Sequence, residues 1–370
     1  MHYSSRRRQK SGFTVLELLV AVSVTALLAG MLLNITSQVV STQTQASSDL
    51  ETNQVAQFIL DRIQEDLHCA VYKNDGNVWL AASIPEDTSI STSWKDDGVT
   101  AGKPTNDSGS LRIVPTDWTD GPNDIFANSN NQLSLIDSRF GVAGTFLRFF
   151  TQAPELDPDI SNTGGARAIS YQIIRHGITK ASTSRPRYQL FRSDVTTKET
   201  FNAGYNLHPT EGNYNYSGSN GSRSPGNIMN PIFNDADGVS TDFSLASNVI
   251  DFGIRAFYIN QHTSGTGNLV QIFPDVNAST GGSPPYNYFA TNNPNYIGET
   301  GKPSKYSKFP EVIDVMIRIL SSEGASAISA FEDGLIPPPN GFSPDEYWWE
   351  LAEKNSEVYV RRIRVFASGI

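Results

Sequence analysis

An apolar segment near the amino terminus, with an acid close to its start, is the feature that most limits what this chain can fold into. From Phe13 to Leu33 the sequence runs for 21 residues, and the only polar side chains among them are Thr14, Glu17, Ser23 and Thr25. As a helix, such a segment rises about 30 Å, the thickness of the hydrocarbon core of a membrane. A carboxylate inside that core is costly unless it has a partner, so Glu17 predicts a functional acid.

Basic residues come directly before the apolar segment: Arg6, Arg7, Arg8 and Lys10. Such a cluster stays on the cytoplasmic side of a membrane, so the amino terminus is expected inside the cell. A plain secretory signal peptide is the alternative, but its apolar part is usually about 7 to 15 residues long and free of acids. The sequence therefore favours a single membrane-spanning helix.

The residues around the acid also carry a family resemblance. Gly12-Phe13-Thr14-Val15-Leu16-Glu17-Leu18-Leu19-Val20 resembles the prepilin processing site of type IV pilins and type II secretion pseudopilins. The resemblance implies that a prepilin peptidase/methyltransferase cuts after Gly12 and methylates the new terminal amine of Phe13. Residues 1–12 would then be a basic prepilin leader.

The same resemblance gives Glu17 a role in filament assembly. In the family, the matching carboxylate faces the terminal amine of a neighbouring subunit, and two opposite charges buried together cost less than one charge buried alone. The alternative is an acid at the level of the lipid headgroups that has no partner. Asn34 stands where many major pilins carry a proline, which favours a minor pilin or a pseudopilin.

Helical spacing continues beyond the apolar segment. No proline occurs before Pro85, and the apolar residues Val55, Phe58, Ile59, Ile63 and Leu67 recur at helical intervals. We expect one helix from Phe13 to about residue 72, with residues 13–33 in the membrane and residues 34–72 outside it. Residues 73–370 are expected to form a pilin-like α+β globular domain.

The expected strands of this domain are short, and they are rich in aromatic and β-branched residues. They cover residues 145–151, 168–174, 187–195, 249–260, 269–273, 310–320 and 357–367, and residues 343–354 carry a helix start signal. The predicted fold class is α+β, a long amino-terminal helix packed on an antiparallel sheet with long loop insertions at 73–145 and 196–244. The order of these strands resembles that of J-type minor pseudopilins, and the length of residues 310–320 suits the centre of a sheet.

Charge and composition exclude some functions. The formal net charge is −10, and it becomes −14 when the first twelve residues are removed, so no nucleic-acid partner is expected. The five histidines are isolated from one another, the single cysteine, Cys69, directly follows His68 without the spacing of a zinc or nucleophile site, and no phosphate-binding loop is present. We therefore expect no catalytic activity and no cofactor.

Two acidic loops are candidates for calcium binding. Closely spaced carboxylates beside a glycine suit a hard cation, and the two groups are Asp117, Asp120 and Asp124, and Asp235, Asp237 and Asp242. Neither completes a known calcium-loop pattern, so solvated turn acids are the competing interpretation. The aromatic run Tyr347-Trp348-Trp349 similarly fits either core packing or a contact surface.

These observations predict a prepilin-like structural subunit in a bacterial inner membrane. It would span the membrane once, with its amino terminus cytoplasmic and its globular domain periplasmic, and assemble through its helix with other pilin-like subunits. The expected role is a minor subunit of a type II secretion-like pseudopilus. The alternatives are a minor type IV pilin for adhesion or DNA uptake, and a membrane-anchored glycan-binding module or enzyme.

Overall fold

The structure is a computed structural model, and it describes residues 14–83, 145–152, 165–177, 186–208, 214, 229, 234–235, 238–239, 244–261, 267–273, 287–293, 308–342, 344–366 and 368–369. The chain divides into two compact units, Met1–Glu51 and Thr52–Ile370. The first unit contains most of helix α1, and the second contains the end of α1 and all of the strands.

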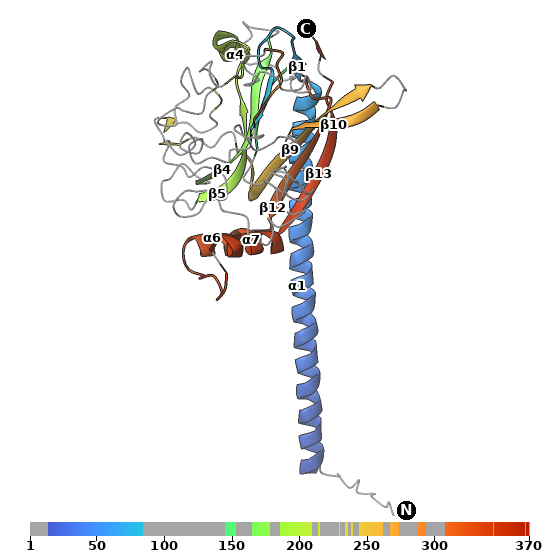
Figure 1. Ribbon diagram of the computed structural model, residues 1–370. Helices are drawn as coiled ribbons and strands as arrows, with labels where there is room; N and C mark the ends of the chain where they lie inside the picture. Colours follow the sequence, from blue (N-terminus) through green and yellow to red (C-terminus); the bar gives the residue numbers. More distant parts are fainter. Residues whose placement is uncertain are drawn as a thin grey trace, which may run out of the picture. The chain divides into compact units, whose positions relative to one another are not determined.

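Helix α1 spans Val15–His68, and its 54 residues would measure about 80 Å along the axis (Figure 1). The predicted long helix is therefore confirmed, although it ends four residues before the expected position. Up to residue 47 its side chains are exposed on every side. A helix that is apolar all round needs a membrane or other helices to cover it, and α1 has the length and composition to span a membrane.

The second unit contains a six-stranded antiparallel sheet in the order β11-β2-β3-β4-β5-β8. Its strands are β2 (Leu80–Ser83), β3 (Phe146–Thr151), β4 (Arg167–Gly177), β5 (Pro186–Asp194), β8 (Ser244–Ser247) and β11 (Asn287–Phe289). A four-stranded antiparallel sheet has the order β10-β9-β12-β13. Its strands are β9 (Val249–Gln261), β10 (Gly267–Phe273), β12 (Val312–Leu320) and β13 (Ser356–Arg364).

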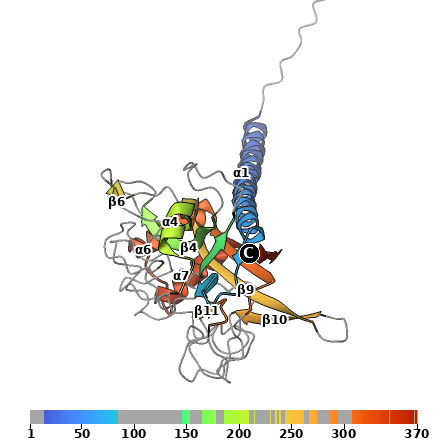
Figure 2. The same ribbon diagram turned by 90° about the horizontal axis from the view of Figure 1, so that it is seen from above.

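Smaller elements complete the second unit. Strand β1 (Val71–Tyr72) pairs in parallel with β14 (Ser368–Gly369), and β6 (Asn234–Asp235) pairs with β7 (Gly238–Val239). The helices are α4 (Thr197–Ala203), α6 (Ser322–Glu332) and α7 (Pro344–Lys354). Helices α6 and α7 lie side by side at one end of this unit, and α4 and β1 lie at the other end (Figure 1). The β9–β10 hairpin extends away from the sheets (Figure 2).

The end of α1 contributes to the core through Ala56, Ile59, Leu60, Ile63 and Leu67. The prediction that Phe58 belongs to this buried face is wrong, because its side chain is 56% exposed. Successive helical residues point about 100° apart, and the buried stripe is centred on Ile59 and Ile63, so Phe58 lies outside it.

Strand β12 is one of the two central strands of the four-stranded sheet, as its length predicted, and all nine of its residues are buried. Both tryptophans of the aromatic run, Trp348 and Trp349, are also buried, which confirms core packing for that run. The indole nitrogen of Trp348 donates to Glu332 at 3.0 Å, so α7 is bonded to α6.

Candidate functional site

The first turn of α1 is closed by a reciprocal capping box. The Thr14 hydroxyl accepts a hydrogen bond from the backbone N–H of Glu17 at 3.3 Å. The Glu17 carboxylate accepts from the backbone N–H of Thr14 at 2.9 Å and from its hydroxyl at 3.0 Å. This T-x-x-E arrangement satisfies orphan donors at the start of a helix, and the positive end of the helix dipole favours the carboxylate there. Glu17 therefore accepts hydrogen bonds from its own chain. Neither the expected charge pair with a neighbouring subunit nor the acid without a partner included these bonds.

The other sequence-predicted residues of this region, Gly12, Phe13, Arg6, Arg7, Arg8 and Lys10, lie outside the described residues.

The remaining polar groups of the apolar segment are satisfied inside the helix. Ser23 donates to the carbonyl of Leu19 at 2.8 Å, and Thr25 donates to the carbonyl of Ala21 at 2.9 Å. Such bonds remove the cost of placing a hydroxyl in hydrocarbon. From residue 18 to residue 48 the sequence has no charged side chain, so Glu17 is the only ionisable group of the apolar segment.

At the other end of α1, a buried acid joins the helix to the six-stranded sheet. The Asp66 side chain is fully buried, and Arg192 of β5 donates to it from Nε at 2.7 Å and from Nη2 at 3.0 Å. The Tyr171 hydroxyl of β4 also donates to Asp66. Burial, together with the nearby Asp66 charge, raises the pKa of Tyr171, so this hydroxyl keeps its proton. Burial alone would lower the pKa of Arg192, but its bonds and its attraction to Asp66 raise it.

Further ion pairs extend from Arg192 across the six-stranded sheet. Arg192 also bonds Asp194 at 2.9 Å, and Asp194 forms an ion pair with Arg167 of β4 at 2.9 Å. Burial raises the pKa of Asp194, and the two arginines oppose that effect. The result is an alternating row of charges that ties the end of α1 to β4 and β5.

The four-stranded sheet holds α1 through one arginine. Arg361 of β13 donates to the side chains of Asp61, Gln57 and Gln64 of α1. Asp66 of α1 is bonded to the six-stranded sheet, and Arg361, which bonds α1, belongs to the four-stranded sheet. The last turns of α1 are therefore held by both sheets.

The structure does not describe the side chains of the two predicted calcium loops. Asp235 lies in β6, and Asp237, Asp242, Asp117, Asp120 and Asp124 lie outside the described residues. Within the described ranges there is no group of three histidine, cysteine or acidic side chains that could hold a metal ion.

Comparison with known proteins gives one match. The family model described as the prokaryotic N-terminal methylation motif matches residues 7–33, which include Gly12, Phe13, Thr14 and Glu17. No curated protein and no solved structure matches this chain. The motif, followed by a long and exposed apolar helix, supports a type IV pilin-like chain whose amino-terminal segment is a prepilin substrate.

Proposed function

We propose that this protein is a minor subunit of a type II secretion-like pseudopilus, cleaved after Gly12, methylated at Phe13 and assembled through α1. The observation that supports this most directly is the methylation motif at residues 7–33, where the Thr14–Glu17 capping box opens a helix whose side chains are exposed on all sides up to residue 47. Prepilin peptidase and other pilin-like subunits are the partners that such a motif implies.

The physical chemistry of α1 agrees with assembly through this helix. Its exposed apolar side chains need lipid before assembly and neighbouring helices afterwards. Glu17 is held at the start of the helix by Thr14, close to the predicted new terminus at Phe13. In an assembled filament, the terminal amine of a neighbour would supply the opposite charge that a buried carboxylate requires.

The proposed location is the bacterial inner membrane, with the amino terminus cytoplasmic and the unit Thr52–Ile370 periplasmic. The four basic residues of the leader support that orientation. The proposal includes neither catalytic activity nor a cofactor. Calcium binding at Asp235, Asp237 and Asp242 stays a separate prediction, which calorimetric titration with calcium chloride would measure.

A deletion strain tests the proposal against its runner-up, a minor type IV pilin. We expect loss of protein secretion with surface pili retained, and recovery when the wild-type chain is restored. Glu17→Gln should fail to restore secretion because it removes the charge, whereas Glu51→Gln, a matched change further along α1, should restore it. Loss of pili with normal secretion would favour the type IV pilin instead, and normal levels of both would contradict both roles.

A further inference from the structure

The loop between α6 and α7 is held in one shape and exposes apolar side chains. Helix α6 ends in a Schellman motif, in which Leu335 N–H donates to the Ala330 carbonyl at 2.9 Å and Gly334 N–H donates to the Phe331 carbonyl at 3.0 Å. Gly334 has a φ of 72°, the left-handed conformation that this motif requires.

The rest of the loop is also restrained. Residues 337–339 are three consecutive prolines, and Phe342 N–H donates to the carbonyl of Pro339 at 3.2 Å across a turn. Even so, Leu335 is 68% exposed and Phe342 is 45% exposed. An ordered loop that presents large apolar side chains loses little entropy on binding, so it suits docking onto another surface.

The surroundings of this loop are acidic. Residues 321–355 contain seven acidic residues and one lysine, a net charge of −6. Asp333, Glu350 and Glu353 are among the acids of this segment. We call the segment 321–355 the acidic hairpin. Its charge disfavours an anionic lipid surface and favours a basic protein surface.

A basic surface of this kind lies on the face of the four-stranded sheet opposite α1. Arg361 points toward α1, so the alternate residues of β13, among them Val360, Arg362 and Arg364, lie on the other face. The register places Asp314 between Arg255 and Arg362, and Arg364 opposite Val312. We call this surface the arginine face, and its exposed or partly exposed charged residues are Arg255, Arg362 and Arg364, whereas Asp314 between Arg255 and Arg362 is buried.

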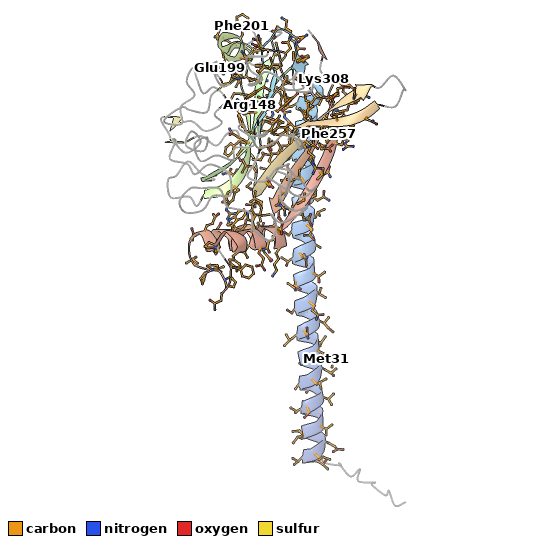
Figure 3. The ribbon with its side chains drawn as sticks, viewed as in Figure 1. Met31, Arg148, Glu199, Phe201, Phe257 and Lys308 are labelled. Atoms are coloured by element: carbon orange, nitrogen blue, oxygen red, sulfur yellow. The ribbon has the colours of Figure 1, made fainter. Side chains whose placement is uncertain are left out.

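The arginine face has the composition of a protein-binding surface. Its three arginines exceed its one aspartate, Asp314, which pairs with Arg362, although the chain as a whole has a charge of −10. Val360 is 50% exposed, and the Arg362 side chain is 59% exposed. The Cζ atom of Arg362 lies 5.6 Å from the ring centroid of Phe257, a residue of β9 that is labelled in Figure 3. Arginine, aromatic and aliphatic side chains without lysine are typical of protein interfaces.

The two surfaces lie at opposite ends of the same strand ladder. Strand β12 leads from Leu320 directly into α6, whereas Arg364 pairs with Val312 at the other end of β12. Nine rows of a sheet cover about 30 Å. For the acidic hairpin of a second copy with the same direction to reach the arginine face, that copy has to lie beside the first copy and be displaced along the ladder.

We propose that the acidic hairpin of one copy docks on the arginine face of a second copy of this chain. The contact is heterologous, because two different surfaces meet. It preserves the common orientation that two chains anchored in one membrane need. The inference rests on the proposed function only for that shared membrane, and it adds a contact between globular units to the assembly through α1.

Cysteine cross-linking of full-length chains tests this contact. Two differently tagged chains, both carrying Cys69→Ser, are expressed together with a prepilin peptidase, one with Leu335→Cys and the other with Val360→Cys. Both positions are exposed, so folding should be unchanged. We expect a mixed dimer on treatment with a bis-maleimide, and none when Phe201→Cys, an exposed position on α4, replaces Leu335→Cys.

Substitutions that reverse a charge are the second test of this contact. Glu350→Arg and Arg364→Glu should each lower the mixed dimer about fivefold, because each opposes the attraction between the surfaces, and the pair together should restore part of it. A yield that neither single change lowers would overturn the proposal. So would a dimer of two Leu335→Cys chains, or a Leu335→Cys thiol that is shielded from a water-soluble maleimide without forming the mixed dimer.

The mass of the same purified chains separates this proposal from the proposed function. Processed chains that form no mixed dimer overturn only the contact between globular units. Unprocessed chains overturn the proposed function, and the dimer yield measured in detergent micelles still decides the contact.

Discussion

Single residues decide how α1 is attached to the sheets, and Asp66 has the largest effect among the acids of its last turns. Its carboxylate is fully buried and accepts two bonds from Arg192 and one from Tyr171. Asp61, one turn earlier, pairs with Arg361, but its side chain is 71% exposed. A buried ion pair that loses one partner leaves an uncompensated charge, whereas an exposed pair exchanges its partner for water.

We therefore predict different costs for two matched substitutions. Asp66→Asn should lower the free energy of unfolding by about 3 kcal/mol, because the buried Arg192 loses its bidentate counter-ion and keeps only Asp194. Asp61→Asn should cost less than about 1 kcal/mol. Urea denaturation followed by tryptophan fluorescence measures both, since Trp348 and Trp349 are buried in the same unit. Equal costs for the two variants would contradict the assigned roles.

The surroundings of Cys69 give a prediction about the reactivity of its thiol at pH 8. Partial burial raises the pKa of its thiol, and the Asp66 and Glu65 charges add to that effect. A raised pKa leaves less thiolate at pH 8, and the thiolate is the reactive form. Alkylation of the native chain by iodoacetamide at pH 8 should be slower than alkylation of the urea-unfolded chain. A native thiol that reacts as fast as the unfolded one would show that the site does not raise the pKa.

At the scale of elements, the sequence predicted those strands that carry their own signal. Strands β9, β12 and β13 are long and rich in β-branched residues, and each was expected close to its observed bounds. Strands β2 and β11, with sequences LAAS and NYF, were not expected, because they are held by their neighbours in the sheet. Helix α6 was also missed.

The candidate site also contains some residues that a local sequence pattern predicts and others that it does not. Glu17 follows from a local motif, and the T-x-x-E spacing could also have indicated the Thr14 cap. The bond between Asp66 and Arg192 joins residues 126 positions apart, and no local pattern specifies it. An acid within the buried stripe of α1, beside Ile63 and Leu67, was the available signal, because a buried carboxylate needs a partner.

The junction of α6 and α7 gives a prediction at this scale. A Cβ atom at Gly324 would lie 2.5 Å from Asn355 Cβ and 2.7 Å from its carbonyl oxygen, so the start of α6 depends on a glycine. Alanine favours a helix, but the clash with a backbone atom should outweigh that gain and cost about 1–3 kcal/mol. Ser326→Ala, at an exposed position of the same helix, should be neutral or slightly stabilising. Unfolding midpoints in urea compare the two, and a fully stable Gly324→Ala variant would contradict the packing.

In the whole molecule, the two units carry different features. The unit Met1–Glu51 carries the methylation motif and the exposed apolar part of α1, which are the parts needed for processing and anchoring. The unit Thr52–Ile370 carries the sheets and two surfaces of opposite charge. Each unit alone would be incomplete as a filament subunit, because anchoring and lateral contacts come from different parts of the chain.

Intact-mass analysis of the membrane-extracted protein tests whether the amino terminus is processed. The chain is produced with and without a prepilin peptidase, and a Gly12→Val variant serves as the control. We expect a chain that begins at methylated Phe13 only when the peptidase is present and Gly12 is intact. A chain that stays uncut beside an active peptidase, or that is cut at another position, would contradict this expectation.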